Sequence, residues 1–221
     1  MSDLSPGEQE VTVWATDLGG NSGSDTVTFT VVPLNQPPTD PVVYITPPGP
    51  MTEDDLICVA AGSTDPEGGA VTYEFAWDQD GTPTGWSSDT VPGDHTTQGE
   101  LWTCRAIATD DEGAQSTEMS ASVVIENALP SYTSVTLSPS PAYEEDILLC
   151  EPFGWSDPDG DPEGALFEWY VDANQVPGAQ NATLTGNDFD HFQEVECLVY
   201  PDDGVDLGFP VTGYRDPVLL P

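Results

Sequence analysis

The sequence contains no lysine and only two basic residues, Arg105 and Arg215, against 40 acidic residues in a chain of 221. The formal net charge of −38 excludes nucleic acid as an expected partner, because phosphate neutralisation requires clustered Lys and Arg. It disfavours an anionic membrane surface for the same reason. No apolar run approaches the roughly 20 residues that span a bilayer, so we expect no membrane span. The N-terminus also lacks the basic start and apolar stretch of a signal peptide.

Patterns typical of enzymes are missing too. The sequence contains no nucleophile elbow, no phosphate-binding loop and no zinc-spaced group of Cys and His. His95 and His191 do not fall on equivalent positions of the repeat described below, which indicates surface residues. A pair of glycosidase carboxylates could be chosen almost anywhere among 40 acids, so that pattern has no specificity. We therefore expect no catalytic residues.

What the sequence does contain indicates a folded chain rather than an acidic disordered one. Hydrophobic residues make up 37% of it, with six Trp, seven Tyr and seven Phe. Disordered acidic segments have few such residues. The 21 Gly and 22 Pro suit many short strands joined by turns.

An internal repeat organises the chain. A shift of 92 residues places Glu53-Asp54 on Glu145-Asp146, Cys58 on Cys150 and Trp77 on Trp169, and a shift of 93 places Cys104 on Cys197. We therefore expect two copies of one domain, at 36–128 and 129–221. The segment 1–35 resembles the end of a further copy. Its two alternating runs around a Gly-rich turn predict a β-hairpin, followed by a linker.

The fold class predicted from these features is all-β: tandem immunoglobulin-like β-sandwiches preceded by an N-terminal hairpin that is a partial sandwich. Alternating runs of five to nine residues lie between Gly, Pro and Asp turns, and helical periodicity is absent. A Trp follows the first Cys of each domain by 19 positions and precedes the second by 27 or 28. A Cys on the second strand, a Trp on the third and a Cys on the sixth form the immunoglobulin core, so we expect Trp77 and Trp169 to pack on inter-sheet bridges.

Several sequence blocks resemble tandem bacterial immunoglobulin-like surface repeats. They are 55–58, 63–68, 73–77 and 99–104, with 147–150, 155–161 and 167–170 one repeat later. The hairpin resembles the last strands of cadherin-like or polycystic-kidney-disease-type modules. The resemblance implies an extracellular repeat of a secreted or surface protein, without catalytic residues. The Tyr usual two positions before the second Cys is replaced by Trp102 and Val195, which argues against a tyrosine corner.

Four cysteines allow three pairings. The repeat selects Cys58–Cys104 and Cys150–Cys197, and the alternative is four reduced, buried thiols. Persistent disulfides require an oxidising compartment, so we expect an extracellular or cell-surface location.

The acids gather where loops and linkers meet at one end of each predicted sandwich. Close carboxylates repel one another, and Ca²⁺, which takes six to eight oxygen ligands, relieves that repulsion. Calcium is therefore the one cofactor we expect, by analogy with cadherin junctions. The candidate ligands are Asn35, Asp40, Asp65, Glu67, Asp110, Asp111, Asn127, Asp157, Asp159, Asp161, Asp202 and Asp203. The alternatives are solvated acidic turns, and adaptation to high salt or a need for solubility.

The function expected from the sequence is that of a non-enzymatic structural protein, a stalk or a subunit of a bacterial surface filament. Its expected partners are other copies of itself or neighbouring repeats, and its hairpin would complete a neighbour's sheet by strand donation. The alternative is an adhesive or carbohydrate-binding accessory region of a larger secreted protein, with an unknown glycan or protein ligand. Trp86 and Trp102 are candidates for a sugar platform, whereas Trp14 and Trp155 are expected to pack in a core or junction.

Overall fold

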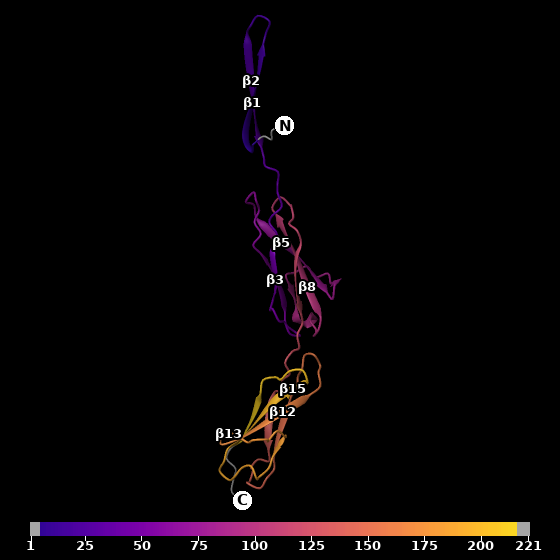
Figure 1. The fold of residues 1–221 in the computed structure, drawn as a ribbon, viewed down its shortest axis with the longest axis vertical. Coiled ribbons are helices and arrows are strands. Elements are labelled where there is room, and N and C mark those ends of the chain that lie inside the picture. Colours follow the sequence, from indigo (N-terminus) through magenta and orange to yellow (C-terminus); the bar gives the residue numbers. More distant parts are fainter. Residues whose placement is uncertain (1–4, 216–221) are drawn as a thin grey trace.

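The computed structural model describes residues 5–215, and for Tyr214 and Arg215 the backbone only. A hairpin and two β-sandwiches follow one another along the long axis of the molecule (Figure 1). The regular secondary structure of the described part of the chain is all strand apart from one short 3-10 helix at Gly93–His95. The predicted all-β fold class is therefore confirmed. No helix in residues 5–215 is long and apolar enough to cross a bilayer.

The N-terminal hairpin consists of β1 (Gly7–Thr16) and β2 (Ser22–Val31), which form a sheet of their own. Opposite residues of an antiparallel pair share a face, so the register sorts the side chains into two kinds. One face carries Val11 opposite Val27, and the other carries Thr12 hydrogen-bonded to Thr26 at 2.8 Å. The turn is held by the Asp17 carboxylate, which accepts the N–H groups of Gly19 and Asn21.

The first sandwich contains seven strands in two sheets. They are β3 (Val42–Thr46), β4 (Leu56–Ala61), β5 (Val71–Gln79), β6 (Thr82–Pro83), β7 (Thr90–Val91), β8 (Leu101–Asp110) and β9 (Met119–Val124). One sheet has the order β3-β4-β7 and the other the order β6-β5-β8-β9. All pairings within these sheets are antiparallel, as in immunoglobulin-like sandwiches.

The second sandwich repeats this topology strand for strand. Its strands are β10 (Ser134–Ser138), β11 (Leu148–Phe153), β12 (Gly164–Val171), β13 (Asn174–Gln175), β14 (Thr183–Leu184), β15 (Val195–Asp202) and β16 (Val211–Arg215). The sheets have the orders β10-β11-β14 and β13-β12-β15-β16. Equivalent strands thus occupy equivalent places in both sandwiches.

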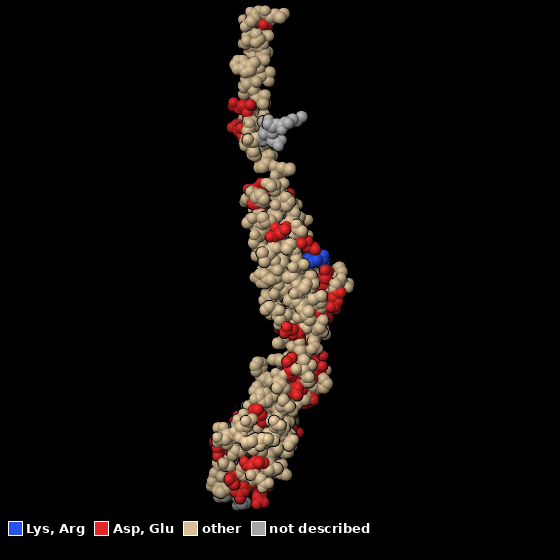
Figure 2. Space-filling model, in the orientation of Figure 1, with Lys and Arg blue, Asp and Glu red and all other residues tan. Residues whose placement is uncertain are grey.

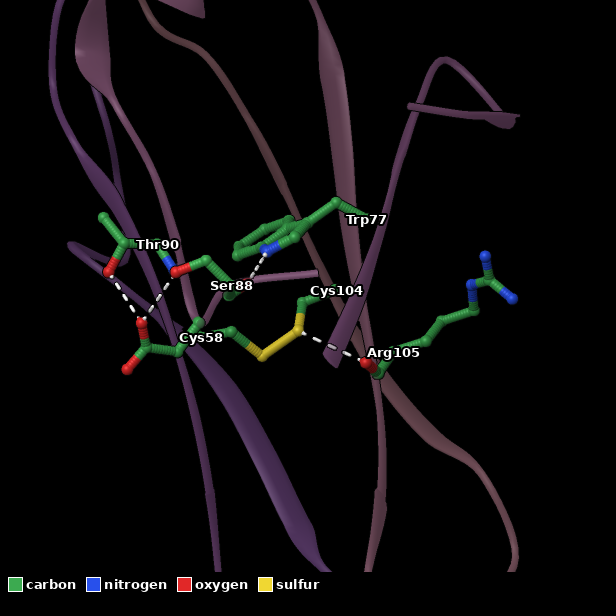
Figure 3. The surroundings of a disulfide bond; sticks show 7 residues. Cys58, Trp77, Ser88, Thr90, Cys104 and Arg105 are labelled. Carbon is green, nitrogen blue, oxygen red and sulfur yellow. Dashed lines mark hydrogen bonds between the residues drawn. A yellow bond between two sulfur atoms is a disulfide. The ribbon is translucent and has the colours of Figure 1, made fainter. Parts of the chain in front are cut away.

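A disulfide joins the two sheets of each sandwich. Cys58 on β4 is bonded to Cys104 on β8, and Cys150 on β11 is bonded to Cys197 on β15. All four cysteines are at most 2% exposed. Figure 3 shows the first bridge with Trp77 beside it, whose Nε1–H donates to the Ser88 carbonyl at 2.9 Å. In the second sandwich, the Nε1–H of Trp169 on β12 donates to the Asn181 carbonyl at 2.8 Å.

The other tryptophans divide between core and surface. Trp102, which replaces the corner tyrosine, is 1% exposed and lies edge-on to Trp77 at a centroid distance of 6.2 Å. It is therefore unavailable as a sugar platform. Trp155 is half-buried against the core of the second sandwich, as expected. The prediction that Trp14 packs in a core is wrong: it lies on the polar face of the hairpin and is 72% exposed.

Candidate metal site at the domain junctions

The same Asn–Asp hydrogen bond occurs at both junctions. At the first junction, between hairpin and first sandwich, Asn35 Nδ2 donates to Asp110 Oδ2 at 3.0 Å. At the second junction, between the sandwiches, Asn127 Nδ2 donates to Asp203 Oδ2 at 2.9 Å. The two asparagines are 92 positions apart and the two aspartates 93, so the contact belongs to the repeat. Each bond joins a linker to the end of the sixth strand of the next sandwich, at the last residue of β8 or the residue after β15.

Backbone N–H groups complete the surroundings of both aspartates. Asp203 Oδ1 accepts from Val205 and Asp206, and it is 4% exposed. Burial alone would raise the pKa of Asp203, but the Asn127 amide and these backbone donors outweigh burial and hold the pKa below its ordinary 3.8. The pKa of Asp110 is lowered in the same way, by its own loop and by Asn35, against the effect of its burial. Both groups are therefore ionised and satisfied.

A second cluster of acids lies in the loop after β11, and this loop is close to Asp203. Oxygen atoms of Asp157, Asp159 and Asp161 lie within 4.8 Å of one another. Asp159 reaches across the second junction: it accepts the hydroxyl of Thr52 from the first sandwich and the N–H of Ala128 in the linker, the latter at 2.7 Å. Acidic side chains gather where the sandwiches meet (Figure 2).

This cluster, unlike Asp203, is short of partners. The Oδ2 atoms of Asp157 and Asp161 are inaccessible to solvent and have no hydrogen-bond partner. Burial, and then the charges of Asp157, Asp203 and Asp159, raise the pKa of Asp161. Converging carboxylate oxygens that lack donors are the ligands that a hard divalent cation prefers. Asp157 and Asp161 therefore offer unpartnered oxygens that fit Ca²⁺, whereas the oxygens of Asp159 already accept hydrogen bonds and would share them with the ion. A bound cation would remove the charge repulsion that adds to burial in raising the pKa of Asp161.

The predicted ligands at the first junction are not gathered in this way. Among the described residues, only the group 157–161 brings three acidic or metal-ligating side chains within 4.8 Å. The carboxylates at the first junction have protein donors instead: Glu67 accepts from both the backbone and side-chain amides of Gln36, and Asp40 accepts the N–H of Thr117. Asp65 accepts the N–H of Glu67 and of Gly69.

The remaining candidate ligands lie outside the group 157–161 or already have hydrogen-bond partners in the protein. Asp111 lies against Gly69, where an added Cβ would collide with it. Asp202 accepts the N–H of Gly204. Asn35 and Asn127 donate hydrogen bonds from Nδ2 to carboxylates, and their role as calcium ligands stays a prediction.

Three residues of the junctions were missed by sequence reasoning. Thr52 reaches Asp159, Gln36 reaches Glu67, and Asp206 accepts from Asn127 at 3.2 Å. Gln36 adjoins Asn35 and could have been included with it. No signal in the sequence marks Thr52, whose loop arrives at the junction only because of the sandwich topology.

Comparisons with known proteins concern the fold. No family model and no curated protein matches the chain. Similar solved structures include the FN1–FN3 domains of chicken CNTN1 (12% identity, TM-score 0.34, covering 95% of this chain and 77% of that one). Others are a two-domain fibronectin type-III segment of chicken tenascin (12%, 0.42, 82% and 99%) and fibronectin(III)-like modules of Clostridium thermocellum CbhA (16%, 0.30, 81% and 95%). The assignment to immunoglobulin-like sandwiches rests on the strand order above, and the likeness to cadherin-like modules stays a prediction.

Proposed function

We propose that this chain is a non-enzymatic structural segment of an extracellular or cell-surface protein, a stalk or filament subunit built from rigid sandwiches. The second junction supports this proposal most directly. There, Thr52 of the first sandwich and Ala128 of the linker both donate to Asp159 of the second sandwich. Asn127 of the linker accepts from Gln98 of the first sandwich and donates to Asp203 of the second. A linker bonded on both sides resists bending more than a free one does.

The two disulfides support an extracellular location. Cysteine pairs persist where the environment is oxidising. Each bridge closes a sequence separation of 46 or 47 residues between the two sheets of its sandwich. A bridge of this kind protects a domain of this size against unfolding, which suits a protein that carries load.

The proposal includes a Ca²⁺ ion at the second junction, bound by Asp157, Asp159 and Asp161. The bound ion would neutralise the cluster that faces Thr52 and Ala128, and so fix the angle between the sandwiches. Thermal unfolding of the full chain in chelator and in millimolar CaCl₂ tests this. We expect Ca²⁺ to raise the midpoint in the parent protein.

A substitution distinguishes Ca²⁺ bound at this site from Ca²⁺ that merely screens the negative charge of the whole chain. Asp161→Asn should raise the midpoint in chelator, because it removes one of the repelling charges, and should remove the response to Ca²⁺. Glu10→Gln, a loss of the same charge on the exposed polar face of the hairpin, should leave that response intact. An equal response to Ca²⁺ in all three proteins would show that calcium acts by screening alone.

The hairpin is the proposed coupling element between copies. Each described sandwich has its own seven strands, so the hairpin is not needed to complete one of them. The hairpin instead offers an apolar face that includes Val11, Val13, Val27 and Phe29, which are 37–63% exposed. We place the contact between copies on this face, against the same face of a second chain.

Sedimentation at increasing concentration, with electron microscopy of the same samples, tests the coupling. The parent chain should form pairs joined at their N-terminal hairpins, because a contact between identical faces joins two copies. Val11→Asp should abolish association, because it places a charge opposite Val27 within the apolar contact, whereas Ser24→Asp on the opposite face should preserve it. Monomeric short rods at every concentration would contradict self-association and leave the stalk proposal standing.

A further inference from the structure

The outer faces of the four-stranded sheets differ between the sandwiches in one respect. On the first, Arg105 of β8 points away from the disulfide (Figure 3). Its Nη2 lies 2.9 Å from Asp78 Oδ1 and its Nη1 lies 3.6 Å from Glu118 Oε2. The first sandwich therefore supplies a guanidinium to the acids of this face.

Among the residues whose side chains the structure describes, the second sandwich has no such cation on its equivalent face. The residue 93 positions after Arg105 is Leu198 on β15, and both are at the same register position of their sheets. Arg105 pairs with Ala76, whereas Leu198 pairs with Glu168. At this position the first sandwich has an arginine next to an alanine, and the second has a leucine next to a glutamate.

Glu168 is held in place by two tyrosines. Its Oε2 accepts the hydroxyl of Tyr170 at 3.0 Å and that of Tyr200 at 3.3 Å, and all three side chains are half-buried. The hydrogen bond to Glu168 is the largest cause of a raised pKa for Tyr170, and burial is the largest for Tyr200. Within the described residues, no ion pair joins Glu168 or the nearby Glu196 to a basic group.

A hollow of about 340 Å³ lies over this carboxylate. It is lined by Leu166, Phe167, Glu168, Gln180, Tyr200 and Leu207. Apolar and aromatic walls around one carboxyl group suit an aliphatic stem that ends in a cation, because the stem packs on the walls while the cation meets the carboxyl oxygens. A neutral ligand would leave that charge uncompensated in the hollow.

We propose that this hollow binds an arginine or lysine side chain from a basic segment of a partner protein. The partner's cation would take, in trans, the place on the sheet that Arg105 takes within the first sandwich. The charge of −38 favours such a partner and speeds its approach. This inference is independent of the calcium site and of the hairpin contact.

The test is an NMR titration of the full ¹⁵N-labelled chain with Nα-acetyl-arginine amide. We expect saturable shifts on β12 and β15 around Glu168 and Tyr200. The uncharged isostere Nα-acetyl-citrulline amide should give none. Glu168→Gln keeps an acceptor for the tyrosines and should weaken binding at least tenfold. Glu74→Gln, which removes the same charge from the exposed face of β5, should change it less than twofold.

A gain-of-contact variant completes the test. Leu198→Arg restores the arginine of the first sandwich next to Glu168, so it should fill the site and block the probe in a protein that remains folded. The inference is overturned if shifts spread over the acidic surface, if Glu74→Gln weakens binding as much as Glu168→Gln, or if folded Leu198→Arg still binds the probe.

Discussion

Replacing Asn127 by alanine should destabilise the second sandwich, although Asn127 lies in the linker before it. The side chain donates to Asp203 at 2.9 Å and to Asp206 at 3.2 Å, and it accepts from Gln98 at 3.0 Å. Asn127 is 9% exposed and Asp203 is 4% exposed. The substitution therefore leaves a buried carboxylate without its side-chain donor.

The magnitude follows from the kind of bond that is lost. A hydrogen bond to a charged group contributes about 1.5–3 kcal/mol, and the backbone donors to Asp203 remain, so we expect a loss of about 2–3 kcal/mol at pH 7. For a domain of this size each kcal/mol shifts the midpoint by roughly 4–8 °C, which gives a decrease of roughly 10–20 °C.

The pH dependence of this loss has a definite sign. The pKa of Asp203 is held below 3.8 in the folded state, so its stabilising contribution is present above that pH and is lost as the pH falls through the folded pKa. The parent chain and Asn127→Ala should therefore differ most near neutrality and converge below pH 3.8.

Calorimetry in chelator, combined with hydrogen exchange measured by mass spectrometry, checks both expectations. Peptides from β15 should exchange faster in Asn127→Ala, and those from β8 should not. The control is Asn35→Ala, which should affect β8 through Asp110 and leave β15 unchanged. The reasoning would be refuted if exchange in β15 were unaltered, or if the deficit persisted undiminished at pH 3.

Two further outcomes are expected. Replacing Cys150 and Cys197 together by serine should cost about 4 kcal/mol on the chain-entropy model for a separation of 47 residues, and calorimetry should show the second sandwich melting roughly 20 °C lower. Burial, and then Glu163, raise the pKa of Tyr132 to about 12. The unfolded chain loses this proton near pH 10, so stability should fall between pH 10 and 12, and Tyr132→Phe should lessen the fall in denaturant titrations.

The sandwiches were predictable because their signals are local or repeated. The Cys–Trp–Cys spacing identified the second, third and sixth strands, and long alternating runs such as 101–109 became β8. The two-residue strands β6, β7, β13 and β14 were not predictable, because alternation cannot be recognised over two positions. Their place is set by pairing with longer neighbours.

The candidate site was predictable only in part. Sequence reasoning identified Asp157, Asp159 and Asp161 from their spacing, but it treated Asp110 and Asp203 as equivalent to them. The difference lies in contacts between distant segments: Asn127 reaches Asp203 across 76 positions, and Asn35 reaches Asp110 across 75. Composition cannot distinguish a carboxylate that already has donors from one that lacks them. The exposed Trp14 follows likewise from the absence of an opposing sheet over the hairpin in the described chain.

The Asn–Asp contact has a consequence for how such a chain can change in length. The first sandwich brings Asp110 for the linker before it, and it is followed by Asn127, which bonds to Asp203 of the second sandwich. A duplicated unit of about 92 residues would therefore carry both the aspartate acceptor and the asparagine donor. Every new domain junction would already have its hydrogen-bond donor and acceptor. A gene encoding this pattern could lengthen or shorten its product by whole units without any compensating substitution at the new boundary.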